Sequence, residues 1–498
     1  MPASAGFPFS LLALPDAGVG RYVYFRCVNH APMSETVLDR RHTALMLVAM
    51  FVATLMDGLD SSIVSVALPN IGDDLGIDTG TAAWVTMIYM MVLAGLIIPF
   101  ARVCSNYGVK LILTLGFALF TVSSLFCGLF NSFPILIAAR AVQGVGAAML
   151  AAAGPICCTE HLPRNRLAFG LGVLTIGASL GYAIGPAVGG IVVELLSWHW
   201  IFLINIPIGM IVIPIAFLSI PSDSEVREKK DLDLVGTATF FFAMSSAIFA
   251  IETVAYPDLV TLSCIAAVLF VIFTAVFIAW ERRHPEPMLK LSMFRDLGFC
   301  SVFLCMMFVN IAYMILIYLV PFYGEISLGL SPMEIGLLLF IPSVITAVTG
   351  LPVSKLSDRY GRRPFCIIAG AITMFSVLLY VFLADSLDIV TLAFVLVPQG
   401  LGWAFVGGPM ASRLVEHAGA ERDMAASMTN EAYYIGGALG LAVGAMVFTA
   451  FSHSDGVDIM DVTASAFNDG FVAACIVAAV FAAAIVVMSY LLRDDRQE

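Results

Sequence analysis

The sequence has little charge for its length of 498 residues, because only 12% of them are Asp, Glu, Lys or Arg. Soluble domains carry about a quarter charged residues, whereas 60% of this chain is hydrophobic and its mean hydropathy is +0.97. A soluble fold cannot hide so much apolar surface, but a lipid bilayer can face it directly. The net charge of -12 does not indicate a basic surface, so we expect no nucleic-acid partner.

Catalytic and metal-binding patterns are also missing. The sequence has no Gly-Lys dipeptide, which excludes a Walker A loop, and no HExxH or CxxC pattern. Its ten cysteines lie in apolar segments, beside basic loops or near the N-terminus, so we expect free thiols rather than disulfides. The loops between apolar segments are too short to fold a catalytic domain. We therefore expect no enzymatic activity, no cofactor and no bound metal.

Long apolar segments are what the sequence has in quantity. A single helix needs about 20 mostly apolar residues to cross a bilayer, and runs this long and uniform are unlike barrel strands. Fourteen such segments lie near residues 43–68, 81–102, 110–130, 133–156, 167–194, 198–220, 232–254, 257–280, 297–323, 331–354, 364–384, 388–412, 425–451 and 468–492. The sequence therefore predicts an all-α membrane protein with fourteen transmembrane helices.

The distribution of the 24 basic residues tests this count. Two of them lie within residues 1–32 and one is Arg140, while the remaining 21 all fall in alternate loops and at the chain ends. The intervening loops, such as NIGDDLGIDTG and SHSDGVDIMD, carry acids and neither Lys nor Arg. The positive-inside rule places the basic loops in the cytoplasm. We therefore expect an even number of spans in the cytoplasmic membrane of a prokaryote, with both chain termini inside the cell.

The chain ends differ from the apolar middle. Residues 1–32 contain an apolar run, FPFSLLAL, but no basic region precedes it, so they do not resemble a secretory signal. Two interpretations remain open for them: they belong to a disordered arm, residues 1–41, or translation starts at Met33. At the other end we expect residues 493–498 to form a short cytoplasmic tail.

The two halves of the apolar region repeat each other. AVQGVGAAMLAAAGP resembles VPQGLGWAFVGGP, and IGASLGYAIG resembles IGGALGLAVG. Repeats of this kind mark two homologous bundles, and transporters place their site between such bundles near the membrane midplane. Because the repeats pair helix 4 with 12 and helix 5 with 13, we expect six-helix bundles over residues 42–220 and 297–492. The two remaining helices, within residues 221–296, are then an insertion.

Four motifs in order along the chain resemble those of the major facilitator superfamily, and specifically its fourteen-helix drug:proton antiporter family. They are LDSSIVSVALPNI (59–71), LIAARAVQGVGAA (136–148), GASLGYAIGPAVGG (177–190) and SKLSDRYGRR (354–363). The resemblance covers residues 42–492. It implies a major facilitator fold of two six-helix bundles plus two inserted helices. It also implies an exporter of small lipophilic substrates that uses the proton gradient and no cofactor.

Two carboxylates, Asp57 and Asp60, lie in the first predicted helix and near one face of it, because their spacing is i, i+3. A charge near the bilayer centre costs about 2.5–3.5 kcal/mol, which makes both residues functional candidates. Burial favours the protonated form of a carboxylate, so such a residue can load and release protons. The family's acidic position matches Asp60, and the resemblance implies a proton or cation site there. A structural hydrogen bond inside the bundle is the alternative.

Arg140 is the only basic residue well inside a predicted helix. It must meet a carboxylate, backbone carbonyls or water there, and Asp60 is the partner that we expect. The resemblance implies a role in proton coupling, and a fixed pair that only locks the helix is the alternative. Gln143 and Gly144 follow in the same motif, and we expect Gln143 to pack and hydrogen-bond.

The fifth predicted helix carries a small residue at every fourth position, which lets another helix approach closely. Its motif consists of Gly177, Gly181, Gly185, Pro186, Gly189 and Gly190. Pro186 interrupts the backbone hydrogen bonds and favours a bend. The stripe itself is structural, and only the resemblance connects it with export, because exporters carry this antiporter motif.

The two halves differ in the cytoplasmic loop that follows their second helix. The second-half loop contains Asp358, Arg359, Gly361, Arg362 and Arg363, which match the family's gate motif. Asp358 can cap a helix start and pair with basic neighbours, which holds the cytoplasmic side closed; positive-inside anchoring is the alternative. The first-half loop has Ser105 and Asn106 where the family has an acid and an arginine. We expect the first half to lack the usual charged latch.

Glu431 lies about two turns into the thirteenth predicted helix, where the family seldom has an acid. It either faces the cavity and binds a cation or lies near cytoplasmic water.

Three functions remain open at this point. The first is proton-coupled efflux of lipophilic and often cationic drugs or toxic compounds by alternating access. The second is dedicated export of a single metabolite, such as a siderophore, a bile-acid-like or a lipid-like molecule. The third is a non-transporting membrane sensor, which the retention of Asp60, Arg140 and Asp358 disfavours. We expect the chain to function as a monomer in the bilayer.

Overall fold

The computed structural model describes residues 40–221, 231–253, 259–384, 388–452 and 462–491. Most of the predicted arm, its alternative start at Met33 and the tail 493–498 lie outside the described residues. The first helix begins at Arg40. Arg40 and Arg41 are therefore helical, although the arm was predicted to extend to residue 41.

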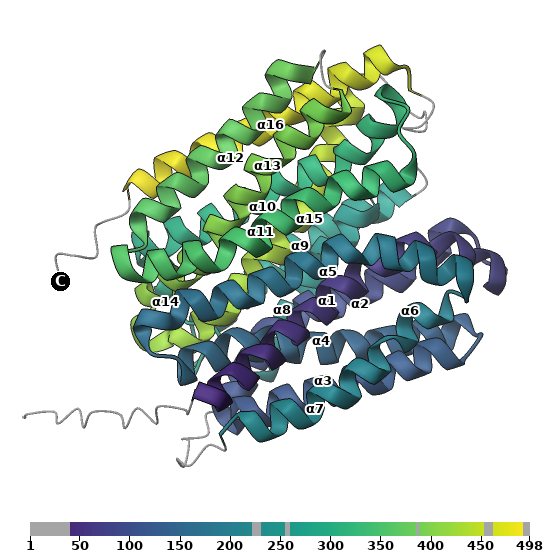
Figure 1. Cartoon of the computed structure of the whole chain (residues 1–498). Helices are drawn as coiled ribbons and strands as arrows, with labels where there is room; N and C mark the ends of the chain where they lie inside the picture. The colour runs from purple at the N-terminus through teal and green to yellow at the C-terminus, as the bar shows by residue number, and fades with distance from the viewer. Residues whose placement is uncertain (1–39, 222–230, 254–258, 385–387, 453–461, 492–498) are drawn as a thin grey trace, which may run out of the picture. The chain divides into compact units, whose positions relative to one another are not determined.

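Every described span is helical (Figure 1). The first bundle contains α1 (Arg40–Leu75), α2 (Thr79–Tyr107), α3 (Val109–Leu129), α4 (Phe133–His161), α5 (Leu167–Leu195) and a sixth span made of α6 (His199–Leu203) and α7 (Asn205–Ser219). The next two helices are α8 (Leu234–Thr253) and α9 (Val260–Glu281). The second bundle contains α10 (Leu297–Phe322), α11 (Pro332–Tyr360), α12 (Arg363–Leu383), α13 (Ile389–Phe405) continued by α14 (Ala411–His417), α15 (Arg422–Ser452) and α16 (Ala464–Leu491).

Fourteen helices in the described part of the chain are long and apolar enough to cross a membrane. The number and the all-α class agree with the sequence prediction. Some spans, such as α1 and α11, extend beyond the predicted apolar segments by up to two turns, because polar residues at their ends continue the helix. Asp78, for example, accepts a hydrogen bond from Thr81 N at 2.9 Å and thereby caps α2.

The glycine motif of α5 packs against α1, as its small-residue spacing predicts. A Cβ atom added to Gly181 would lie 2.5 Å from the Leu55 carbonyl oxygen, and one added to Gly177 would lie 2.6 Å from that of Phe51. The two backbones are therefore in contact, and no larger side chain fits between them. Gly190 differs from these positions, because an added Cβ would meet nothing within 4 Å.

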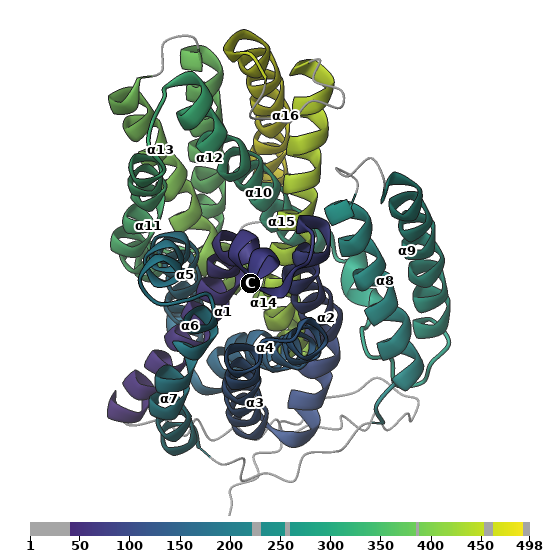
Figure 2. The same ribbon diagram turned by 90° about the vertical axis from the view of Figure 1, so that its right-hand side faces the viewer.

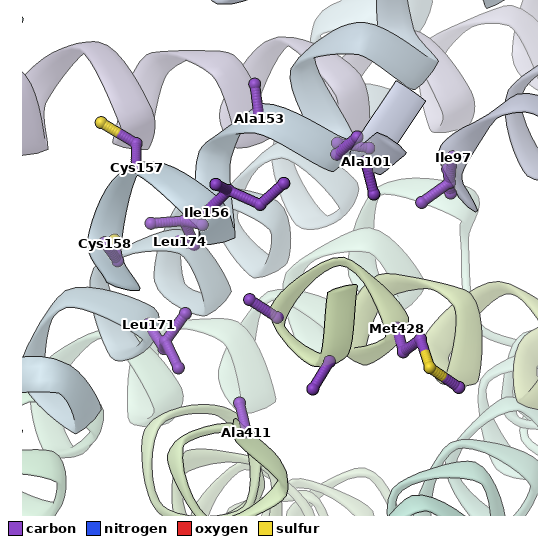
Figure 3. Close-up of a cluster of buried hydrophobic side chains, with 14 of the residues drawn as sticks. Ile97, Ala101, Ala153, Ile156, Cys157, Cys158, Leu171, Leu174, Ala411 and Met428 are labelled. Atoms are coloured by element: carbon purple, nitrogen blue, oxygen red, sulfur yellow. The ribbon is translucent and has the colours of Figure 1, made fainter. Parts of the chain in front are cut away.

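The two bundles meet along a few helices. α5 packs against α11, while α15 packs against α4 and α2. The inserted helices α8 and α9 stand beside the bundles (Figure 2), with α8 in contact with α2. Apolar side chains of α2, α4, α5, α14 and α15 form one buried cluster (Figure 3). The cluster joins residues of both bundles, so it closes the interface between them.

Candidate functional site

A buried ion pair connects α1 with α4. Arg140 Nη1 lies 2.5 Å from Asp60 Oδ2, and neither side chain is exposed. Arg140 Nε donates to the Val85 carbonyl oxygen at 2.9 Å, and the guanidinium lies over the Tyr89 ring at 4.2 Å. The partner expected from the sequence is thus the partner found, and the charge of Asp60 is neutralised inside the first bundle.

Gln143 completes this network. Its Nε2 donates to Asp60 Oδ1 at 2.9 Å and to Ser124 Oγ at 2.8 Å, while its Oε1 accepts from Arg140 Nη1 at 2.8 Å. Gly144 beside it has a packing role, because an added Cβ would lie 2.9 Å from the Tyr89 carbonyl oxygen. Asp60 therefore has both carboxylate oxygens bound by protein groups.

Asp57 lies one turn earlier on α1 and has different partners. Tyr89 of α2 donates its hydroxyl to Asp57 Oδ1 at 2.7 Å, and Tyr434 of α15 donates to Oδ2 at 2.5 Å. One of these bonds stays within the first bundle, and the other crosses to the second. The sequence predicted that Asp57 and Asp60 lie near one face of the helix, but it did not identify either tyrosine. Their sequence positions do not single them out as partners of Asp57, because a tyrosine in an apolar helix has many hydrogen-bond acceptors within reach.

Asp57 also lines a central cavity between the bundles, whereas Asp60 does not. The wall includes Tyr182 from the first bundle and Trp403 and Tyr433 from the second. Trp403 donates its indole N–H to Ser179 Oγ at 3.0 Å across the bundle interface, and its ring lies 5.8 Å from that of Tyr433. The space that water-sized spheres can reach in the cavity is about 90 Å³.

Glu431 is absent from the cavity lining, although Thr429, Asn430, Tyr433 and Tyr434 of the same helix belong to it. The side chain is only 3% exposed, and neither carboxylate oxygen has a hydrogen-bond partner among the described residues. The structure therefore places Glu431 in neither of the two predicted positions. The reason is helical geometry: the cavity-facing side of α15 is taken by its neighbours, and Glu431 points into packed protein.

The second-half loop forms a latch between the bundles. Asp358, near the end of α11, accepts from the backbone N–H groups of Ala168 at 3.2 Å and Phe169 at 3.1 Å, in the first turn of α5. Arg362 Nη2 donates to Asp358 Oδ1 at 3.1 Å and to the Arg164 carbonyl oxygen at 3.0 Å. Asp358 thus caps a helix of the opposite bundle, where the helix dipole favours a negative charge.

The arginines of the gate motif also contact other parts of the second half of the chain. Arg362 also pairs with Glu416, and burial lowers the pKa of the Arg362 guanidinium while Asp358 acts in the opposite direction. Arg363 donates to the Tyr490 carbonyl oxygen at 2.9 Å, and Arg359 lies 5.4 Å from the Tyr360 ring. Gly361 ends α11 with a φ of 92°, a conformation that favours glycine.

The first-half loop has a serine, Ser105, at the position aligned with Asp358. Ser105 Oγ donates to the Arg102 carbonyl oxygen of its own helix at 2.8 Å. The first half instead contributes Thr159 of α4, whose hydroxyl donates to Asp423 Oδ1 of α15 at 2.7 Å. No pattern in the sequence predicts this second bridge, because Thr159 and Asp423 are 264 residues apart and belong to no motif.

Comparison with known proteins agrees with this architecture. The chain matches the Major Facilitator Superfamily over residues 50–441 and 298–498. It is 31% identical to the putative multidrug resistance protein MdtD of Escherichia coli over 360 residues, which are 70% of this chain and 71% of MdtD. It is 27% identical to the multidrug efflux pump LfrA of Mycolicibacterium smegmatis over 445 residues, covering 87% and 86% of the two chains.

The chain is also similar to a riboflavin transporter in sequence and to an organic anion transporter in fold. The chain is 26% identical to the riboflavin transporter RibZ of Clostridioides difficile over 371 residues, or 74% of this chain and 80% of RibZ. Its fold resembles the crystal structure of the human organic anion transporter MFSD10, with a TM-score of 0.60 and 14% identity over 90% of this chain and 99% of that one. The chain belongs to the Major Facilitator Superfamily, and within it to the fourteen-helix drug:proton antiporter type.

Proposed function

We propose that this membrane protein is a secondary active transporter that exports lipophilic and often cationic compounds in exchange for protons. The observation that carries this proposal is the central cavity, where one carboxylate, Asp57, meets aromatic side chains of both bundles. A carboxylate attracts a cation, and aromatic faces bind both cations and apolar rings. The two multidrug-named relatives support the same substrate class.

Alternating access follows from the size of the cavity and the position of the latch. A drug-sized ligand needs a pocket of roughly 300–1,000 Å³, and the cavity offers about 90 Å³. The bundles must therefore separate before a ligand enters or leaves. Asp358 and Arg362 join the bundles at the side that carries the basic loops, which we place in the cytoplasm. In our proposal the structure is closed on that side.

Proton coupling is assigned to the ion pair of α1 and α4. A proton on Asp60 removes the negative charge that holds Arg140, so the pair loosens and the network with Gln143 rearranges. Asp57 then serves as the contact for the exported compound or as a second proton site. Glu431 stays a candidate for proton binding, because a buried carboxyl group without a partner is favoured in its neutral form.

A second candidate is the dedicated export of one metabolite on the same scaffold. The similarity to a riboflavin transporter favours it. The polar groups of Asn310 and Asn430 at the cavity also suit a ligand with fixed hydrogen-bonding positions.

We further propose that both termini are cytoplasmic, that the protein acts as a monomer without enzymatic activity, and that the proton gradient is its energy source.

Accumulation of ethidium in cells without their own efflux pumps tests the proposal. Cells that express the chain should hold less ethidium than control cells, and a proton uncoupler should remove the difference. Asp60→Asn should also remove it at equal expression, because an amide cannot cycle a proton. If a panel of lipophilic cations accumulated equally with and without the protein, drug export would be rejected in favour of the single-metabolite alternative.

A further inference from the structure

A second and larger cavity lies between the inserted helices and the segment that leads to α10. Water-sized spheres reach about 1060 Å³ of it. Its wall is formed by residues of α8 and α9, among them Phe240, Phe270 and Phe277, and by the segment 282–295, which includes Arg282 and Arg295. The two transporter bundles do not enclose it, so it is separate from the central cavity.

The wall changes in chemistry along its length. The part formed by α8 and α9 is apolar apart from Thr274 and Glu281, whereas the following segment carries Arg282, Lys290 and Arg295. Lys290 is paired with Glu421. The guanidinium groups of Arg282 and Arg295 are exposed and make no hydrogen bond or ion pair with another described residue. Two positive charges therefore face the rim of an apolar cavity.

Buried hydrogen bonds hold this cavity in shape. Asp233 immediately precedes α8. Trp280, at the end of α9, donates its indole N–H to Asp233 Oδ1 at 2.8 Å. The N–H of Gly236 donates to the same oxygen at 2.7 Å. Glu281 Oε2 accepts from the Leu289 backbone N–H at 3.3 Å, which ties the basic segment back to α9. One oxygen of the acid in the cavity wall is thus bonded to the protein backbone, whereas Glu281 Oε1 has no hydrogen-bond partner among the described residues.

We propose that this cavity binds an anionic phospholipid. Its acyl chains lie along Phe240, Phe270 and Phe277, and its phosphate lies between Arg282 and Arg295. Three features identify a lipid rather than a transported compound. The cavity touches α9, whose surface is mostly exposed and apolar and so faces lipid. Its basic rim lies on the side where the positive-inside rule places the cytoplasm. Basic pockets between membrane helices on that side suit anionic headgroups.

The test is native mass spectrometry of the full chain in mild detergent, titrated with palmitoyl-oleoyl phosphatidylglycerol or with the matching phosphatidylethanolamine. The wild-type protein should bind phosphatidylglycerol about tenfold more tightly. Arg282→Gln combined with Arg295→Gln should weaken this binding about 30-fold, since each basic residue contributes roughly fivefold in affinity. The matched control is Arg283→Gln combined with Arg41→Gln, which removes the same charge from exposed positions outside the wall.

A third variant tests the cavity itself. Thr274→Trp fills it without a change in charge, so it should weaken the binding of both lipids. Equal phosphatidylglycerol binding in the two double variants would overturn the proposal, and so would unchanged binding in Thr274→Trp. Displacement of the lipid by equimolar glycerol phosphate would show a site for free phosphate groups, which also rejects a lipid site. Because no transport is measured, the outcome is independent of the proposed export function.

Discussion

The two bundles repeat one another in backbone but carry their charges in different places. In the first bundle, Arg140 and Asp60 form an ion pair inside the membrane region. The fourth-helix motif aligns Gln143 with Gln399 and therefore Arg140 with Leu396. Leu396 is buried, and Gln399 accepts only a hydrogen bond from Tyr380 at 3.2 Å. The second bundle thus has an uncharged counterpart at the same position.

In the loops that follow the second helix of each half, the situation is reversed. The turn after the second helix of each half contains a glycine with nearly the same backbone conformation, Gly108 with a φ of 89° and Gly361 with a φ of 92°. The second-half loop bonds to the other bundle through Asp358, and the aligned Ser105 donates a hydrogen bond to the Arg102 carbonyl oxygen of its own helix. The first bundle thus carries the buried ion pair, and the second carries the acid that bonds to the opposite bundle; in our proposal these serve as the coupling charges and the latch.

The largest effect is expected when Arg140 is replaced by leucine, the residue at the aligned position of the second bundle. Arg140→Leu leaves Asp60 buried without its cation, which should destabilise the protein by about 3–5 kcal/mol and abolish transport. Adding Asp60→Asn should restore much of the stability, because the charge that needed pairing has gone. It should not restore transport, because an amide cannot cycle a proton. Thermal unfolding in detergent and ethidium efflux measure the two effects. A double variant that transported normally would remove the ion pair from the mechanism.

The next effect concerns the latch. Asp358→Asn loses a charge-assisted contact worth about 1.5–3 kcal/mol, which is a large part of the ~5.5 kcal/mol that moves a two-state equilibrium between its extremes. We expect at least tenfold slower efflux. Ser105→Ala, its counterpart, should retain near-normal efflux at matched expression. Equal defects in the two variants would show that both loops latch and that the asymmetry is not functional.

A smaller difference separates the two aligned glutamines. Gln143→Leu leaves Asp60, Arg140 and Ser124 each short of one partner, at a cost of about 1–3 kcal/mol. Gln399→Leu loses one neutral hydrogen bond to Tyr380, worth about 1 kcal/mol. The melting temperature should therefore fall further for Gln143→Leu. Similar shifts for both variants would mean that the first-bundle network is no more demanding than its counterpart.

The smallest expected effect distinguishes a contact within a bundle from one between bundles. Tyr434→Phe and Tyr89→Phe each remove one hydroxyl from Asp57, but only Tyr434 belongs to the second bundle. Loss of about 1 kcal/mol from the interface should change the balance of open and closed states roughly fivefold for Tyr434→Phe alone. Labelling of a cysteine placed at Ser179 in the cavity reports that balance. A larger change for Tyr89→Phe would contradict this assignment.

The sequence by itself determined the spans, because the bilayer requires each helix to carry its own apolar length. It also identified the pairing of Asp60 with Arg140, since an arginine inside the membrane region needs a carboxylate and few were available. The position of the gate motif in the second half, and the loss of its charged residues from the first-half loop, could also be read from the sequence. These features depend on composition and local spacing, which the chain carries without reference to its fold.

Only the tertiary structure decided where the remaining polar groups point. The rotation of α15 about its axis brings Tyr434 to Asp57 and turns Glu431 into packed protein, although the two residues are three positions apart. The acceptors and donors of the latch are separated by 190 residues in the chain. The second cavity forms where α8 and α9 meet the segment that leads to α10. Helix rotation and docking result from packing of the whole molecule, and no local pattern in the sequence specifies them.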